Sequence, residues 1–286
     1  MAATAEDGDG ALVSTAWLAE RLNAPDVRVI DATWFLPSAG RSGKAEYARA
    51  HLPGAVFFDI DEISDDASPY PHTVPSAAKF SSRARRMGLG DGVRIVAYDN
   101  NGFMASARAW WMFRHFGHQD VAVLDGGLAK WVAEGRPVDD APVRPAERHF
   151  TARQNNLMLR ELDQVRANLT GRREQLVDAR SPGRFRGTEP EPRPGLRGGH
   201  VPGSRNLFFL DLVAPDGTLK PEDELRRAFA AAGVDTAAPI VTTCGSGVSA
   251  CVLNLALHRL GRPDTALYDG SWSEWGAQPD TPVARD

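Results

Sequence analysis

Residues 240–250 read Ile-Val-Thr-Thr-Cys-Gly-Ser-Gly-Val-Ser-Ala, and residues 251–260 continue Cys-Val-Leu-Asn-Leu-Ala-Leu-His-Arg-Leu. The β-branched run ending at Cys244 predicts a buried strand, and the leucines that follow recur at helical spacing. The loop between them holds two glycines and two serines, so its N–H groups can converge near the positive end of the helix dipole. Such a point favours an anion, and the thiolate is the reactive form of cysteine. The stretch therefore predicts a nucleophilic Cys244 in an anion cradle.

The alternative for Cys244 is a small buried core residue, which is how most free cysteines behave. Two features favour chemistry. Open α/β sheets bind ligands at the carboxyl ends of their parallel strands, and glycines begin helices poorly unless the shape of the loop is needed. Cys251 lies on the apolar face of the following helix, so we expect it to be structural.

Composition limits the class of protein. The chain has 286 residues, enough for two domains, with 42% hydrophobic and 24% charged residues. A net charge of −4 provides no general attraction for nucleic acid or a membrane surface. The two cysteines form no disulfide framework and match no zinc pattern. We expect a cytoplasmic protein with neither a metal nor another cofactor, and a disordered N-terminus at residues 1–10.

The two halves of the chain repeat one another. Four landmarks recur at offsets of 147, 149, 145 and 144 residues, namely Asp31 and Asp178, His51 and His200, Asp99 and Cys244, and Trp131 and Trp275. Each half alternates short strands and helices, which predicts a mostly parallel sheet with helices on both faces. We expect an N-terminal domain at residues 11–140, a linker at 141–157 and a C-terminal domain at 158–286. Only the second has a cysteine at this position, so the first is expected to be inactive.

Several motifs carry a resemblance to a known family. They are Cys244-Gly-Ser-Gly-Val-Ser-Ala250, the segment Asp178–Arg193, Gly199-His-Val-Pro-Gly203, the Trp110-Trp-Met-Phe run and Asp269-Gly-Ser-Trp272. From about Leu12 to Val283 the chain resembles the tandem rhodanese-domain sulfurtransferases. The resemblance implies two rhodanese folds, a catalytic C-terminal domain and a Cys244 that accepts sulfur as a persulfide. Thiol acceptors such as thioredoxin or a small thiol, and cyanide, are implied as well.

The loop indicates which sulfur donor is used. The thiosulfate-specific branch of the family carries cations at the two positions that are Gly245 and Ser246 here. A close charge pair is worth about 4 kcal/mol at an effective dielectric near 20, so their absence weakens thiosulfate binding. The resemblance therefore points to the branch that uses 3-mercaptopyruvate, with thiosulfate as a weaker donor. Its carboxylate fits Arg184 and Arg193, because guanidinium binds carboxylate bidentately.

The expected site combines the loop with groups from the rest of the chain. Gly245, Gly247, Val248 and Ser249 would supply the cradle that binds the donor. Ser246 would donate to the keto oxygen or relay a proton. The family pattern pairs this serine with a histidine and an aspartate; His51 matches the histidine, whereas the aspartate is missing and Asp59 and Asp61 have no positional support. A structural turn histidine is the alternative for His51.

Three other functions compete with this reading. The first is a thiosulfate:cyanide sulfurtransferase, distinguished by comparing donors. The second is a cysteine-dependent phosphatase, which needs an arginine six positions after the cysteine, where this chain has Ala250. The third is a sulfur carrier or redox-sensing module, since an accessible thiolate is oxidisable.

Overall fold

The computed structural model describes residues 10–286 and divides into two compact units. The first comprises the chain up to Ile63 together with Pro75–Asn155 and Ala214–Leu219, and the second comprises Ser64–Val74, Asn156–Val213 and Lys220–Asp286. The stretch expected to be disordered, residues 1–10, lies outside the described residues apart from Gly10. From residue 10 onward, no helix has the length and apolar character needed to cross a membrane.

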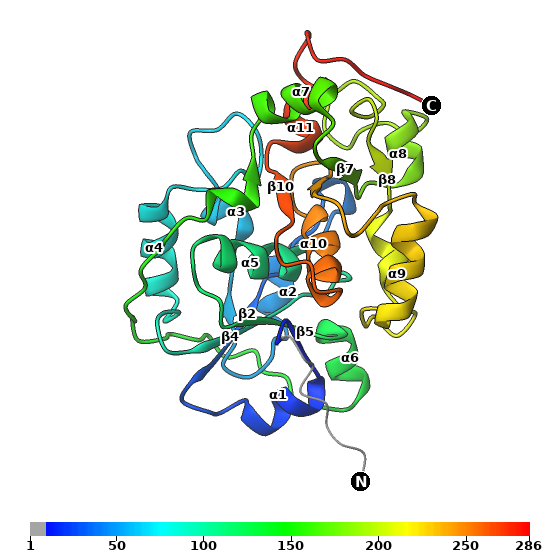
Figure 1. The fold of residues 1–286 in the computed structure, drawn as a ribbon. Coiled ribbons are helices and arrows are strands. Elements are labelled where there is room, and N and C mark those ends of the chain that lie inside the picture. The colour runs from blue at the N-terminus through cyan, green and yellow to red at the C-terminus, as the bar shows by residue number, and fades with distance from the viewer. Residues whose placement is uncertain (1–9) are drawn as a thin grey trace. The chain divides into compact units, whose positions relative to one another are not determined.

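The first unit is built on a five-stranded parallel sheet in the order β1-β5-β4-β2-β3 (Figure 1). Its strands are β1 (Leu12–Val13), β2 (Val27–Asp31), β3 (Val56–Phe57), β4 (Arg94–Tyr98) and β5 (Val121–Leu124). Its helices are α1 (Thr15–Arg21), α2 (Gly43–Tyr47), α3 (Ile60–Ile63), α4 (Ala77–Arg86), α5 (Met104–His115) and α6 (Gly127–Ala133), with a 3₁₀ turn η1 (Pro37–Ala39). Most side chains of the central strands β5, β4 and β2 are buried, as expected of a parallel sheet covered by helices.

The second unit repeats this order as β6-β10-β9-β7-β8, again with every pair parallel. Its strands are β6 (Leu159–Arg160), β7 (Gln175–Asp178), β8 (Arg205–Asn206), β9 (Ile240–Thr243) and β10 (Ala266–Tyr268). Its helices are α7 (Leu162–Gly171), α8 (Pro182–Arg186), α9 (Glu222–Ala231), α10 (Ala250–Arg259) and α11 (Ser271–Trp275), with 3₁₀ turns η2 (Asn156–Met158) and η3 (Phe209–Leu212). The fold class predicted from the repeat is confirmed.

Helix α2 spans Gly43–Tyr47 and begins directly after a serine. The Ser42 hydroxyl accepts the Ala45 N–H at 3.3 Å and so caps the start of the helix. The two-residue strands and the short helices α3 and α8 were not predicted, because they are too short to show a period.

The first part of the linker predicted at residues 141–157, up to Asn155, is part of the first unit. Phe150 is buried there against the rings of Phe80 and Phe113. Its carbonyl accepts the Ser81 hydroxyl at 2.7 Å and the Arg85 guanidinium at 3.1 and 3.2 Å. The segment therefore contributes an aromatic side chain to the core although it has no regular structure.

The tryptophans that end each repeat hold equivalent places. Trp131 and Trp275 are fully buried. Each donates its indole N–H to a proline carbonyl, Pro137 at 2.7 Å and Pro282 at 2.8 Å. A buried indole needs such an acceptor, and the repeat provides it in both units.

Asp99, at the carboxyl end of β4, occupies a ring of main-chain N–H groups. Its Oδ1 accepts the amides of Asn101 (3.2 Å) and Phe103 (3.1 Å), and its Oδ2 accepts those of Ala105 (3.1 Å) and Ser106 (2.8 Å). The last two belong to the first turn of α5, where the helix dipole favours negative charge. The loop of the first unit is therefore an anion cradle filled by its own carboxylate.

We expect Asp99→Ala to lower the free energy of unfolding by about 3 kcal/mol, because it leaves buried N–H groups without their charged acceptor. Chemical denaturation of the full chain would measure the loss. Asp140→Ala, at an exposed position, is the matched control and should unfold like the unaltered protein. Equal stability of the two variants would show that the cradle does not depend on the carboxylate.

Candidate active site around Cys244

Cys244 is the first residue after β9, which lies between β10 and β7 in the sheet. Its side chain is buried at 2% exposure, at the carboxyl end of a central strand. This is the position in the second unit that Asp99 holds in the first. The strand and the following helix α10 were both predicted, and the predicted place of the cysteine is confirmed.

The start of the loop is fixed by residues that the sequence reasoning missed. The Cys244 N–H donates to the Ser271 hydroxyl at 3.2 Å, and that hydroxyl donates to the Tyr268 carbonyl at 2.8 Å. The Gly245 carbonyl accepts both the main-chain N–H and the hydroxyl of Ser273, at 2.8 and 2.6 Å. The beginning of α11 thus holds the main chain on either side of the thiol.

The rest of the loop turns through a glycine. Gly247 has φ 75°, and Gly102 at the same place in the first unit has φ 74°. Val248 is buried, and Ser249 is the residue that precedes α10. Cys251 is fully buried with its thiol 3.3 Å from the Gly247 carbonyl, as expected of a structural residue.

Ser246 contacts a histidine, but not the one that the sequence suggested. Its hydroxyl lies 2.8 Å from Nδ1 of His72, and both side chains are 4% exposed. His72 belongs to Ser64–Val74, the segment of the first repeat that is part of the second unit. Its φ is 63°, in the left-handed region that side chains other than glycine rarely adopt. The histidine at the candidate site is therefore His72.

His51 lies in the first unit and makes the contacts of a structural residue. Its Nδ1 is 2.8 Å from the Tyr47 carbonyl, and its ring stacks on Tyr47. His200, its partner in the repeat, makes the same pair of contacts with Phe185. Both histidines also form an isolated antiparallel bridge, to Asp139 and Ala284 respectively. A contact set present in both repeats indicates a role in the fold.

The two aspartates considered from sequence have defined contacts within the first unit. Asp59 accepts the main-chain N–H groups of Asp61 and Glu62 through Oδ1, at 3.1 and 3.4 Å, at the start of α3. Asp61 accepts the indole N–H of Trp34 at 3.0 Å. Asp59 therefore works as a helix cap.

Arg184 lies against the loop. A side-chain carbon built on Gly245 would stand 2.8 Å from its Nη2, so the guanidinium lies where a larger residue would place its side chain. Arg184 is 18% exposed, and it donates to Glu191 from Nη2 at 2.6 Å and from Nε at 3.3 Å. The Nε/Nη2 edge of the Arg184 guanidinium is thus hydrogen-bonded to Glu191. The Nη1/Nη2 edge is the one left for a carboxylate.

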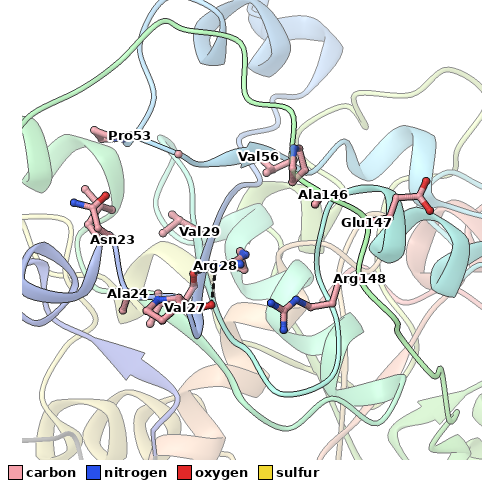
Figure 2. Close-up of a pocket in the computed structure, with 14 residues that line it drawn as sticks. Asn23, Ala24, Val27, Arg28, Val29, Pro53, Val56, Ala146, Glu147 and Arg148 are labelled. Atoms are coloured by element: carbon pink, nitrogen blue, oxygen red, sulfur yellow. Dashed lines mark hydrogen bonds between the residues drawn. The ribbon is translucent and has the colours of Figure 1, made fainter.

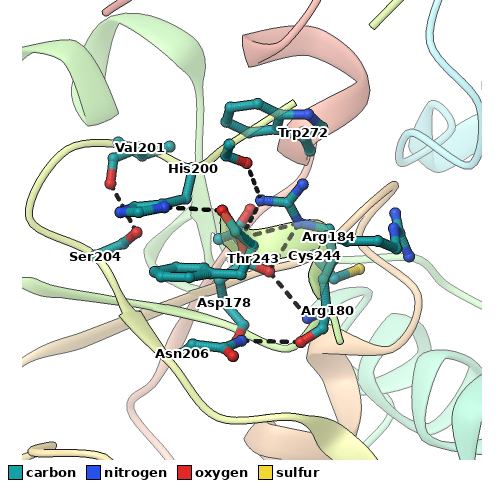
Figure 3. Close-up of polar contacts among 12 residues, drawn as sticks. Asp178, Arg180, Arg184, His200, Val201, Ser204, Asn206, Thr243, Cys244 and Trp272 are labelled. Atoms are coloured by element: carbon teal, nitrogen blue, oxygen red, sulfur yellow. Dashed lines mark hydrogen bonds and ion pairs between the residues drawn. The ribbon is translucent and has the colours of Figure 1, made fainter. Parts of the chain in front are cut away.

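A buried charge network supports Arg184. Arg180, fully buried, donates to both oxygens of Asp178 and, at 2.7 Å, to Glu191. Its guanidinium stands 4.4 Å from the Trp272 ring (Figure 3). Burial opposes the charge of Arg180, but the two carboxylates outweigh it and raise the pKa of its guanidinium. Glu191 is thereby clamped between two arginines.

Arg193 is half-buried two residues after Glu191, in a segment without helix or strand. Its expected contact with substrate stays a prediction.

The first unit contains a hollow of about 400 Å³ (Figure 2). It is lined by Val27 and Arg28 at the amino end of β2, whereas Asp99 and Cys244 follow the carboxyl ends of their strands. A hollow of about 640 Å³ in the second unit has repeat-related lining residues, such as Pro202 and Gly203 for Pro53 and Gly54. We therefore attribute both hollows to the fold that the two units share.

Comparison with known proteins identifies the fold and its relatives. A family model described as the rhodanese-like domain matches residues 14–134 and 161–278. Human 3-mercaptopyruvate sulfurtransferase is 44% identical over 93% of this chain and 91% of its own. Bovine thiosulfate sulfurtransferase is 45% identical over 96% of this chain and 95% of its own.

A solved structure agrees with these relatives. The 3-mercaptopyruvate sulfurtransferase SseA from Escherichia coli aligns with a TM-score of 0.84 and 38% identity, covering 91% of this chain and 98% of that one. Two matches to the domain model, close relatives over nearly the full length and the shared fold agree with the paired sheets described above. The chain belongs to the rhodanese family, as a tandem-domain sulfurtransferase.

Proposed function

We propose that the protein transfers sulfur from 3-mercaptopyruvate to a thiol or cyanide acceptor through a persulfide on Cys244. The observation that carries the choice of donor is Arg184, whose guanidinium lies beside Gly245 directly after the cysteine. It would bind the donor carboxylate while the thiolate faces the donor sulfur. The loop itself carries no cation at Gly245 or Ser246.

The chemistry runs in two steps. The Cys244 thiolate attacks the donor sulfur, so an S–S bond forms, the C–S bond breaks, and its electron pair leaves as pyruvate enolate. The enolate takes up a proton and departs as pyruvate. An acceptor thiolate, from a small thiol or from a protein such as thioredoxin, then attacks the outer sulfur and releases Cys244 as thiolate. A cytoplasmic location, in keeping with two free cysteines, is part of the proposal.

The cradle around Asp99 in the first repeat supports the proposal that Cys244 reacts as an anion. Asp99 is held there by the amides of residues 101, 103, 105 and 106. The offset of 145 residues assigns corresponding roles to the amides of residues 246, 248 and 250, whereas the Cys251 N–H donates to the Val248 carbonyl at 3.1 Å. The first three amides would stabilise the thiolate first and the persulfide afterwards. The first repeat is proposed to be inactive, because its cradle is already filled.

Ser246 and His72 would serve the leaving enolate. The serine hydroxyl can donate to the keto oxygen as negative charge develops there, and the histidine, 2.8 Å away, can exchange a proton with it. Arg193 would add a second positive charge for the carboxylate, as the family resemblance implies.

Thiosulfate:cyanide sulfurtransfer is the second candidate, because the bovine thiosulfate enzyme and the human mercaptopyruvate enzyme are about equally similar to this chain. Sequence identity therefore does not decide which of the two donors this protein uses. Measuring turnover with each donor under the same conditions does.

Cys244→Ser should abolish turnover, because a hydroxyl neither ionises nor accepts sulfur at neutral pH. Mass spectrometry of the unaltered protein mixed with 3-mercaptopyruvate should show one added sulfur atom at Cys244, with pyruvate released. Cys251→Ser is the control and should keep the adduct. Sulfur transfer by the Cys244→Ser protein would refute the mechanism.

His72→Ala should lower kcat by about 100-fold, the usual contribution of a positioned acid–base group. His51→Asn, which keeps a donor for the Tyr47 carbonyl, should retain most of the turnover and change mainly the stability. Steady-state kinetics and thermal unfolding separate the two effects. Loss of turnover in the His51 variant alone would restore the assignment made from sequence.

Arg184→Gln should raise KM for 3-mercaptopyruvate by about 10- to 100-fold, corresponding to the loss of one charge-assisted pair. Arg186→Gln, on the same helix but exposed, is the matched control. An unchanged KM in the Arg184 variant would remove this residue from the substrate site.

A further inference from the structure

The segment that carries His72 is anchored on the second unit at three points. We call residues 64–74 the catalytic strap. The Val74 N–H donates to Asp269 at 2.7 Å, and the Tyr70 hydroxyl accepts from Gln278 at 2.8 Å. Between these anchors His72 meets Ser246. Asp269 is buried, so its hydrogen bond to Val74 competes little with water.

The first unit contains the same arrangement. We call residues 214–219, which come from the second repeat, the silent strap. Its Leu219 N–H donates to Asp125 at 2.8 Å. The two aspartates are 144 residues apart and the two amides 145, and each aspartate directly follows the strand β5 or β10 and precedes a glycine. Each unit thus holds a strap from the other repeat with one equivalent carboxylate.

The straps differ at the residue two positions before the anchored amide. The silent strap has Gly217 there with φ 83°, and the catalytic strap has His72 with φ 63°. A left-handed φ is natural for glycine and unfavourable for a residue with a β-carbon. Both straps have the left-handed φ at this position. Only the catalytic strap, which reaches Ser246, has the strain and the imidazole. An interaction with the rest of the unit must therefore hold His72 in this unfavourable conformation.

We propose that Asp269 is a positioning residue for the reaction. By holding the Val74 N–H it keeps the strap in place and His72 in its left-handed conformation on Ser246. This inference rests on the role proposed above for His72. Asp125 makes the same contact in the first unit, with no imidazole on its strap, so it is the natural control.

The experiment compares Asp269→Ala with Asp125→Ala in the full chain. Both should lose a similar amount of stability, because each removes one carboxylate acceptor of a strap amide. Asp269→Ala should lower kcat by about 10- to 100-fold with little change in KM, and Asp269→Asn, which keeps an acceptor oxygen, should recover most of it. Asp125→Ala should keep its kcat. Equal kcat values for the two alanine variants would overturn the inference.

A double-mutant cycle separates positioning from a general loss of stability. If Asp269 acts through His72, adding Asp269→Ala to His72→Ala should cause no further fall in kcat. Independent, multiplied losses would show that Asp269 acts some other way. Amide hydrogen exchange provides a readout that does not need activity: residues 64–74 should exchange faster in Asp269→Ala, and residues 214–219 in Asp125→Ala.

The same data distinguish failure of this inference from failure of the proposed function. If His72→Ala turns over normally, the catalytic role of the histidine is refuted and the positioning role falls with it, even where exchange shows a loosened strap. If His72→Ala is impaired while Asp269→Ala loosens the strap and keeps kcat, only the positioning role is overturned.

Discussion

Main-chain N–H groups that converge at the carboxyl end of a central strand are the constraint on which the first unit depends, and the proposed function assigns the same constraint to Cys244 in the second. In the first unit they hold the Asp99 carboxylate through four hydrogen bonds. Buried donors without an acceptor are costly, so the residue at this position must be able to become an anion. An aspartate and a cysteine both meet that condition, but only the sulfur can form a bond to another sulfur. In the proposed function, the exchange of aspartate for cysteine replaces the filled cradle of the first unit by a reactive thiol, and Ser246, His72 and Arg184 complete the site.

In the proposed function, the substrate charge is met by a group held outside the loop. Arg184 reaches Gly245 from α8, and Glu191 engages one edge of its guanidinium while Arg180 engages Glu191. Such a buried network is stable only when nearly all of its donors and acceptors are paired. Here Arg180 also donates to Asp178 and to the Gly199 carbonyl. The orientation of Arg184 is fixed before any ligand binds, so little ordering remains to be done on binding. The absent side chain of Gly245 provides the space for this approach.

The sequence predicted what is local or repeated. The central strands, Cys244 and its loop, and the duplicated fold follow from periodicity and constant offsets, and Arg184 followed from a family motif. His72 could not be found in this way, because 174 positions separate it from Ser246 and it reaches that serine on a segment that crosses to the other unit. His51 was chosen from its motif alone. Comparison with His200 argues against that choice, since a histidine present in both repeats is better explained by the fold than by chemistry.

The repeat therefore contains more functional information than either half does alone. At two equivalent positions the backbone has a similar left-handed φ in both units, so a residue that is strained there in one unit and relaxed in the other is held for a reason outside the backbone. His72 at φ 63° stands opposite Gly217 at 83°, and Ser271 at 51° stands opposite Gly127 at 55°. Both strained residues contact the loop of Cys244, one through Ser246 and the other through the Cys244 N–H. A glycine could take either conformation without strain, but it has no imidazole and no hydroxyl. At these two positions the second unit thus carries a strained side chain where the first unit has glycine, and both strained residues contact the loop of the cysteine.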